Sequence, residues 1–238
     1  PAAVQTMLDP ADCGPACIAL SQDIQGQTFD YPEEFFKEKI HAIRRPRPDE
    51  FQIKEAAEKI KSSKNPIIIS GGGVFYSDAM EELSNFAVKH NIPVTQTVMG
   101  YSTMKRDHSH YAGQIGGLGG KNTNSLAKQT DLAIAVGTKL ADFTTGSWAN
   151  FENENFKLVS INVSRFDANK HLAQAVVGDA KVSLDELSQA LGDWKAGEEW
   201  NKKSQAELKV WNEHVDKESA PSNQEVPSYV QVVGAVYK

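Results

Sequence analysis

The sequence predicts a doubly wound α/β domain built on an open parallel sheet, and two observations lead to this prediction. The apolar runs within residues 66–70 and 131–136 lack polar alternation, which is typical of strands buried on both faces. Between such runs lie segments whose apolar residues recur at the helical spacing of about 3.6 residues. Because strand and helix alternate in this way, each strand is expected to lead through a helical crossover to the next parallel strand.

The elements follow in chain order. The predicted helices are residues 51–62, 78–90, 123–129 and 182–191, and the five predicted strands are residues 66–70, 93–98, 131–136, 158–163 and 175–177. Ser77 is placed to cap the second helix. A glycine-rich stretch, GQIGGLGG, is expected to be a loop over residues 113–120.

The two flanks differ from this regular domain. Residues 13–20 are expected to form a turn and a short buried strand, and the RRPRP stretch at 44–48 a stiff linker whose arginines are solvated or ion-paired with a domain. A charged segment without glycine or proline, Glu198–Ser219, is expected to be a connecting helix packed on a neighbouring domain, and an amphipathic segment follows over 229–236. The expected domains are residues 1–48, 49–192 and 193–238. Because the chain starts at Pro1 without an initiator Met, we expect a fragment.

Composition excludes several classes of function. The net charge of −6 over 238 residues argues against a general nucleic-acid binder, since such proteins carry excess Lys and Arg. The sequence contains no apolar run of membrane-spanning length and no signal peptide, so we expect a cytoplasmic protein without membrane contact. Two cysteines, Cys13 and Cys17, support neither a disulfide framework nor a zinc site and are expected to be reduced thiols.

Local motifs do not define a catalytic site. The SGGGVFY stretch at 70–76 lies between a strand and a helix, as a phosphate-binding turn does, but the sixth position of G-x-G-x-x-G is Tyr76. Tight packing of the helix is an equally good interpretation of these glycines. His108 and His110 lack a third metal ligand and are expected in a solvated loop. The DFTTGSW stretch at 142–148 follows the clearest strand and is expected to be the rim of a pocket.

Longer segments resemble the central domain of thiamine-diphosphate enzymes such as acetolactate synthase and pyruvate oxidase. They are NPIIISGGGVFYSDAMEELSNFAVKHNIPVTQTVMG, DLAIAVGTKLADF, LVSINV and VVGDAKVSLDEL, and the likeness covers about residues 50–191. CGPACIALSQDIQ is similar to the last strand of the pyrimidine-binding domain that precedes it in this family. The tail from Trp194 is similar to the connector and the start of the pyrophosphate-binding domain. The resemblance implies a three-layer, Rossmann-like α/β/α fold.

Three loops resemble one branch of this family, which hydrolyses a carbon–carbon bond in the ring of a trihydroxylated cyclic dione during myo-inositol catabolism. They are QDIQGQTFDYPEEFF, HAIRRPRPD and DFTTGSW. The resemblance implies thiamine diphosphate and Mg²⁺ as cofactors, a small cyclic dione as substrate, and a homodimer or homotetramer for the full-length enzyme. An acetolactate synthase-like enzyme whose central domain binds FAD or ADP is the alternative.

The resemblance places the catalytic and metal-binding residues outside this chain. The cofactor-activating glutamate would precede Pro1, and the G-D-G motif that holds Mg²⁺ and diphosphate would follow Lys238. The only Gly-Asp pairs here begin at Gly178 and Gly192, and neither continues to Gly. We therefore expect this segment alone to be inactive, with no catalytic residue or metal ligand of its own.

Some relatives bind FAD or ADP in the central domain, and eight positions match that pattern. They are Gly71, Gly73, Thr97, Gly137, Thr138, Lys139, Asn162 and Asp179. The acidic residue expected to bind the ribose hydroxyls is replaced by Asn162, which removes a charged acceptor. The resemblance therefore implies a vestigial nucleotide site without bound FAD. An NAD-dependent deacylase of similar fold is disfavoured, because it would need G-A-G-x-S and usually four zinc cysteines.

Overall fold

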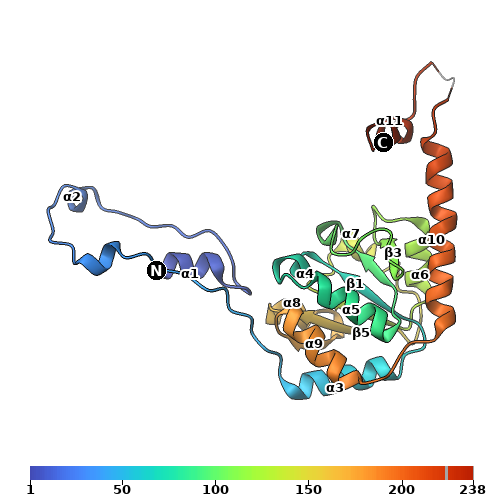
Figure 1. The fold of residues 1–238 in the computed structure, drawn as a ribbon, viewed down its shortest axis with the longest axis horizontal. Coiled ribbons are helices and arrows are strands. Elements are labelled where there is room, and N and C mark those ends of the chain that lie inside the picture. Colours follow the sequence, from blue (N-terminus) through green and yellow to red (C-terminus); the bar gives the residue numbers. More distant parts are fainter. Residues whose placement is uncertain (223–224, 238) are drawn as a thin grey trace.

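The computed structural model describes residues 1–222 and 225–237 (Figure 1). Its centre is a single sheet whose strands are β1 Pro66–Ser70, β2 Val94–Gln96, β3 Tyr111–Gln114, β4 Leu132–Val136, β5 Lys157–Asn162 and β6 Gln174–Val177. All neighbouring strands are parallel, in the order β3-β2-β1-β4-β5-β6. The chain winds outward from β1 in one direction and from β4 in the other, so β1 and β4 form the switch point of a doubly wound sheet.

Helices cover both faces of this sheet and complete the three layers. The helices of the domain are α3 Glu50–Lys61, α4 Gly72–Tyr76, α5 Met80–His90, α6 Lys121–Gln129, α7 Asp142–Thr145, α8 Arg165–Ala168 and α9 Ala180–Leu191, with 3-10 turns η2 Val98–Gly100 and η3 Lys170–Leu172. On one face, α3, α5 and α9 pack on side chains of β1, β4 and β5. On the other face, α6 and the start of α10 Glu198–Ser219 pack on the alternate side chains of β1 and β4. The predicted fold class is confirmed.

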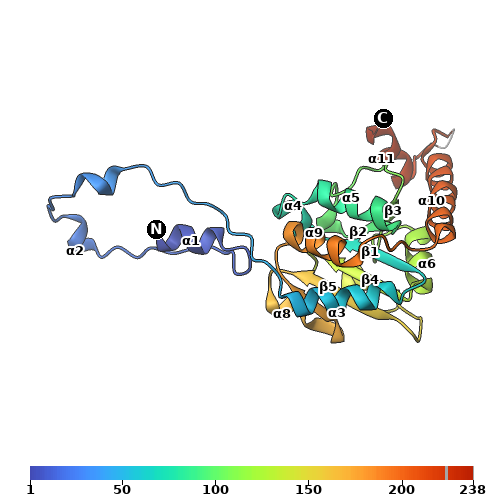
Figure 2. The same ribbon diagram turned by 60° about the horizontal axis from the view of Figure 1, so that its bottom comes forward.

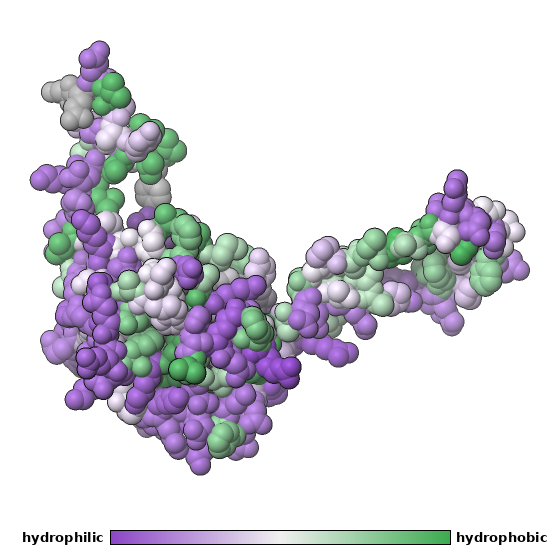
Figure 3. Space-filling view, turned by 180° about the vertical axis from the view of Figure 1, so that it is seen from behind, coloured by the Kyte–Doolittle hydropathy of each residue, from purple (hydrophilic) through white to green (hydrophobic). Residues whose placement is uncertain are grey.

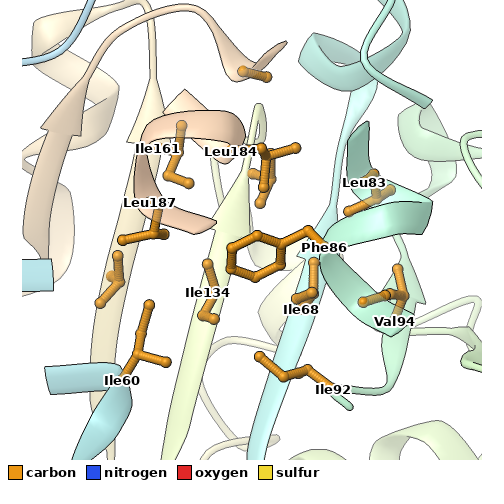
Figure 4. Close-up of a cluster of buried hydrophobic side chains, with 14 of the residues drawn as sticks. Ile60, Ile68, Leu83, Phe86, Ile92, Val94, Ile134, Ile161, Leu184 and Leu187 are labelled. Carbon is orange, nitrogen blue, oxygen red and sulfur yellow. The ribbon is translucent and has the colours of Figure 1, made fainter. Parts of the chain in front are cut away.

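Phe86 of α5 lies at the centre of the first face (Figure 4). It is 2% exposed, and Ile68, Ile134 and Leu187 belong to the same buried cluster. These side chains come from a helix, two central strands and a second helix. Their burial explains why the apolar residues of α5 recur with helical spacing.

The linker is fastened to the domain by ion pairs. Arg45 Nη1 lies 3.1 Å from Asp179 Oδ2, and Arg47 Nη2 lies 2.5 Å from Glu186 Oε1. Asp179 N also donates to Pro46 O at 2.8 Å. Of the two environments predicted for the arginines of RRPRP, the structure shows the ion-paired one for Arg45 and Arg47, while Arg44 is exposed.

The N-terminal arm, residues 1–43, extends away from the domain and contains no buried residue (Figures 1 and 2). It contains α1 Ala2–Leu8, α2 Gln22–Gln25 and the 3-10 turn η1 Glu33–Phe36. The predicted buried strand at residues 13–20 is wrong, since Ile18 and Leu20 are 70% and 67% exposed. A strand requires a paired neighbour, and every described strand belongs to the central sheet. Green apolar patches lie along the arm in Figure 3.

Two further details differ from the prediction. The sheet has a sixth strand, β3, which overlaps the glycine-rich stretch expected to be a loop, and a register shift interrupts its pairing with β2. Ser77 does not cap α5, because it is the C-terminal cap of α4, and Asp78 with φ of 53° turns the chain before Met80. The helix therefore begins at Met80 and not at residue 78 as predicted, because the left-handed conformation of Asp78 interrupts a right-handed helix.

The connecting helix α10 has the bounds predicted from the sequence. Its Trp200 and Leu208 are buried against the domain, and Trp200 Nε1 donates to Pro66 O at 2.8 Å. Beyond this contact α10 continues past the sheet to α11 Tyr229–Tyr237 (Figure 1). No described helix is long and apolar enough to span a membrane.

Candidate functional site

Two glycine turns meet at the switch point of the sheet. The last residues of β1 and β4, Ser70 and Val136, are paired in register, and the turns begin at the next residues. Gly71 N donates to Val136 O at 2.9 Å, and Gly73 N donates to Gly137 O at 2.9 Å. The two turns therefore contact each other through their backbones.

No side chain fits between these turns. A Cβ on Gly71 would lie 2.4 Å from Gly137 O, and one on Gly73 would lie 2.6 Å from Gly137 Cα. Gly137 itself has φ of 59°, a conformation that favours glycine. Close backbone packing thus accounts for all three glycines. It also engages the amides of Gly71 and Gly73, which a bound phosphate would otherwise accept from.

Thr97 holds the neighbouring loop against β1. Its Oγ1 accepts a hydrogen bond from Gly100 N at 3.0 Å and so caps η2. Thr97 N donates to Ser70 O at 3.0 Å. A Cβ on Gly100 would lie 2.1 Å from the same Ser70 oxygen, which shows how closely the loop approaches the strand end.

Asn162 joins the ends of β4 and β5. Its Nδ2 donates to Thr138 O at 3.2 Å, and its Oδ1 accepts from Ser164 N at 3.0 Å. Both ends of the amide are therefore used within the protein. Thr138 is buried and its Oγ1 accepts from Leu140 N at 3.4 Å, whereas Lys139 is exposed.

Asp179 lies apart from these turns, at the end of β6. Its Oδ1 accepts from Lys181 N at 3.0 Å and caps α9, while Oδ2 pairs with Arg45. The structure thus gathers five of the eight predicted residues at the switch point and connects Thr97 to them through β1. The five are Gly71, Gly73, Gly137, Thr138 and Asn162. A vestigial nucleotide site stays a prediction.

The surroundings of the switch point are open and partly apolar. A cavity of about 710 Å³ lies beside the end of β5 and α8, lined by Ala11, Asp12, Val163, Ser164, Arg165, Phe166, Asn169 and Lys170. Large side chains are exposed on the helices and turns after the strands. They are Phe75, Tyr76, Met99, Phe143 and Phe166. This edge of the domain therefore carries several exposed large apolar side chains.

The DFTTGSW stretch forms α7 and a turn beyond β4. Asp142 and Phe143 are exposed, whereas Thr145 is buried. Gly117 N donates to Phe143 O at 2.7 Å, which fixes this stretch on the glycine-rich loop. Ser147 and Trp148 both have positive φ, at 52° and 70°. The stretch presents a carboxylate and an aromatic ring outward, and its place at the rim of a pocket stays a prediction.

The prediction that the histidines of RDHSH lie in a solvated loop is wrong for His110, whereas His108 is half-buried in a turn. His110 is buried, and its Nε2 lies 3.2 Å from Asn91 Oδ1. His108 Nδ1 accepts from His110 N at 3.1 Å, and its Nε2 lies 2.8 Å from Ser84 Oγ. Burial, and then the electrostatic influence of His108, lower the pKa of His110. No group of three His, Cys, Asp or Glu residues in the described part of the chain is placed to hold a metal ion.

Sequence reasoning did not identify His90, the last residue of α5, which is fully buried against α9 and the segment before α10. Its Nδ1 lies 2.7 Å from Trp194 O, and its Nε2 lies 3.0 Å from Ser188 Oγ. Burial lowers the pKa of His90, and the charges of Lys89 and Lys195 lower it further, while the bond to Trp194 raises it. The only sequence signal was its place on the apolar stripe of α5.

Comparison with known proteins gives a consistent picture. Residues 53–187 match the family model described as "Thiamine pyrophosphate enzyme, central domain". Proteins named "3D-(3,5/4)-trihydroxycyclohexane-1,2-dione hydrolase" are similar to most of the chain. The one from Clostridium perfringens strain 13 is 45% identical over 189 residues, covering 79% of this chain and 30% of that protein.

Two other relatives with the same name match further into the flanks. The protein from Clostridium tetani is 41% identical over 230 residues, covering 92% of this chain and 35% of that protein. The protein from Geobacillus thermodenitrificans is 40% identical over 217 residues, covering 90% and 33%. The chain therefore spans about a third of the length of the curated relatives that it matches.

Proposed function

The chain belongs to the thiamine pyrophosphate enzymes and contains their central domain, and on this premise we propose that it is part of a trihydroxycyclohexane-1,2-dione hydrolase. The observation that supports this most is the 41% identity over 92% of the chain to a hydrolase of that name. That match extends beyond the central domain into both flanks. In this proposal, residues 1–48 end a pyrimidine-binding domain and residues 193–238 lead into a pyrophosphate-binding domain.

The proposed reaction is the hydrolysis of a ring carbon–carbon bond next to a carbonyl, as a step of myo-inositol breakdown in the cytoplasm. Water supplies a hydroxyl group to the carbonyl carbon, which becomes a carboxylic acid, and a proton to the carbon released from it. The ring opens and nothing is oxidised overall. Thiamine diphosphate, held with Mg²⁺, supplies the electron sink for this cleavage when it is bound.

The described residues of this chain do not fit that cofactor. They include no carboxylate cluster for Mg²⁺, and the first Gly-Asp pair is engaged elsewhere because Asp179 caps α9 and pairs with Arg45. We therefore assign no chemical step to these residues. The role that we propose for them is structural. They form the central domain of each subunit in the full-length homodimer or homotetramer. The exposed edge with Asp142 and Phe143 faces a neighbouring domain in this proposal.

The full-length protein tests this proposal. With thiamine diphosphate, Mg²⁺ and the cyclic dione, we expect release of one acid per turnover, measured as proton release in a pH-stat and as loss of the dione. Omission of either cofactor should abolish the reaction, and the 238-residue chain alone should be inactive. Condensation of pyruvate to acetolactate without ring opening would instead support the alternative, an acetolactate synthase-like enzyme that binds FAD or ADP.

A further inference from the structure

The loop that joins α9 to α10, residues 192–197, is held on the domain by the end of α5. Ala196 N donates to His90 O at 2.9 Å, and His90 Nδ1 lies 2.7 Å from Trp194 O. Asn91, the C-terminal cap of α5, donates from Nδ2 to Ala196 O at 3.1 Å. Two consecutive residues therefore fasten the 192–197 loop through its backbone.

Few other features hold this loop in place. Ala196 is buried and Trp194 half-buried, whereas the side chains between and before them are exposed. Gly192 has φ of 63°, and nothing lies within 4 Å of a Cβ position on Gly192 or on Gly197. Because a glycine with open space around it stands at each end, both ends of the loop can turn without a steric clash.

His90 carries its proton on Nδ1, since a carbonyl such as Trp194 O can only accept a hydrogen bond. The other nitrogen of the neutral ring, Nε2, then accepts from Ser188 Oγ at 3.0 Å. The same Ser188 oxygen accepts from Lys89 Nζ at 3.1 Å. A second proton on His90 would turn Nε2 into a donor and place a second positive charge beside the oxygen that Lys89 already contacts.

No negative charge among the described residues compensates for a charged His90. The charged groups that act on it are Lys89 of α5 and Lys195 of the loop, both positive, and α9 faces it with the neutral Ser188. The ring of His90 is 0% exposed and packs on the ring of Phe86, with 4.7 Å between the centroids. The charged form is therefore favourable only when water reaches this ring.

His110 acts on the same loop through Asn91. Its Nε2 lies 3.2 Å from Asn91 Oδ1 and donates to it, while Nδ1 accepts from Ser109 Oγ at 3.0 Å. From α10, the neutral Asn201 donates to Ser109 O at 3.4 Å. The titratable group of the described chain that acts on His110 is His108. A second proton on His110 would thus reverse the Ser109 hydroxyl and add a charge without a counter-charge.

We propose that the 192–197 loop is a hinge whose closure depends on pH: protonation of His90 and His110 opens it away from the end of α5 while the sheet stays folded. Opening brings water to His90, and an exposed imidazole is protonated at its ordinary pKa of about 6.5. The closed form is fully retained above that pH. At pH 5 the open form gains by up to about thirtyfold per histidine, the ratio of charged to neutral imidazole in water.

α10 begins directly after this loop, so opening loosens the first turn of α10 from the domain. The sheet keeps its own stability, because every residue of β1 and β4 is buried between two layers of helices. Local opening of a segment with few buried contacts costs less than global unfolding. This inference does not rest on the proposed function.

The test is hydrogen exchange of the 238-residue chain, followed by mass spectrometry at about pH 8 and about pH 5. The protection factor, which is the intrinsic exchange rate divided by the observed one, removes the ordinary effect of pH on exchange. We expect the protection of the amides of residues 194–197 to fall at least about fivefold from pH 8 to pH 5. The amides of β1 and β4 should change less than about twofold.

Variants assign the effect to the two histidines. His90→Gln keeps an N–H donor for Trp194 O but does not titrate, so it should show a smaller fall, and His90→Gln with His110→Gln should show none. His214→Gln, at an exposed site on α10, should behave like the unchanged chain.

Three results would overturn the proposal. The first is equal protection of the 192–197 loop at both pH values in the unchanged chain. The second is an equal loss of protection in this loop and in β1 and β4, which would mean global unfolding. The third is an undiminished fall in folded protein that carries both substitutions. Because the first two results need only the unchanged chain, the test decides even where the double variant does not fold.

Discussion

Gly73 and Gly137 lie backbone against backbone at the switch point of the sheet, with Gly73 N donating to Gly137 O at 2.9 Å. A Cβ on either glycine would come within 2.6 Å of the Cα of the other. This contact joins the turn after β1 to the turn after β4. It makes these glycines part of the framework of the domain, whatever ligand that edge binds.

The first prediction is that Gly73→Ala strongly destabilises the domain. The added methyl group cannot be accommodated without separating the two turns, and overpacking of this kind costs about 1–3 kcal/mol or more. Urea unfolding would measure the loss in free energy of unfolding. Gly197→Ala is the matched control, because nothing lies within 4 Å of its Cβ position, and it should change that free energy little. Equal effects of the two substitutions would contradict the packing argument.

The second prediction is that FAD and ADP do not stabilise this chain. The amides of Gly71 and Gly73 already donate to carbonyls, and both ends of the Asn162 amide are engaged. A ligand at about 100 times its dissociation constant would add about 2.7 kcal/mol to the stability, so a thermal-shift titration would detect binding readily. A saturable rise of the melting temperature with either nucleotide would refute the vestigial site.

The sequence predicted the central strands well because their physical signal is local. Every residue of β1 and β4 is buried, so an unbroken apolar run was sufficient. The edge strand β3 was not predicted, because its four residues include Gly113 at φ of 109° and because the helix that covers it, α10, lies far along the chain. Residues 13–20 look like a strand because of their apolar side chains, but strand formation depends on a partner outside the segment.

The candidate site shows the same difference between features set by local sequence and features set by contacts with distant segments. Glycines and a strand-end Asn at the carboxyl edge were predictable from their order in the sequence. Their mutual engagement was not, because the bond between Gly73 and Gly137 and the bond from Asn162 to Thr138 O depend on the register of neighbouring strands. Nor could the sequence reveal that Asp179 binds Arg45 of the linker.

The third prediction concerns that linker contact. Asp179 is 3% exposed, caps α9 and pairs with Arg45, so Asp179→Ala should lower the free energy of unfolding by about 2 kcal/mol, mostly through the lost cap. Chemical denaturation would measure this. Asp185→Ala, on the exposed face of the same helix, is the control and should have little effect.

The fourth prediction is a trypsin fragment that begins within the linker. Lys37, Lys39 and Arg44 lie in exposed extended chain, whereas Arg45 and Arg47 precede proline, a bond that trypsin cuts poorly. Brief digestion should release the arm and leave a fragment beginning at Arg45, identified by mass spectrometry. A first cut inside α3 or the sheet would contradict the described separation of arm and domain.

The last prediction is that the domain loses stability as the pH falls below about 6.5, the ordinary pKa of histidine. Burial lowers the pKa of both His90 and His110 in the folded protein. The unfolded chain then binds more protons below about pH 6.5, so the free energy of unfolding falls as the pH drops toward the folded-state pKa values, and is fully retained above about pH 6.5. Burial raises the pKa of Glu207, so the protonation of Glu207 raises the free energy of unfolding as the pH falls further and opposes the effect of the histidines.

His90→Gln removes one titrating group, so its free energy of unfolding, measured with urea between about pH 5 and 8, should change less with pH than that of the unchanged chain. His214→Gln, at an exposed site on α10, should leave the slope unchanged, and equal slopes in all three proteins would show that buried neutral histidines do not set this pH dependence.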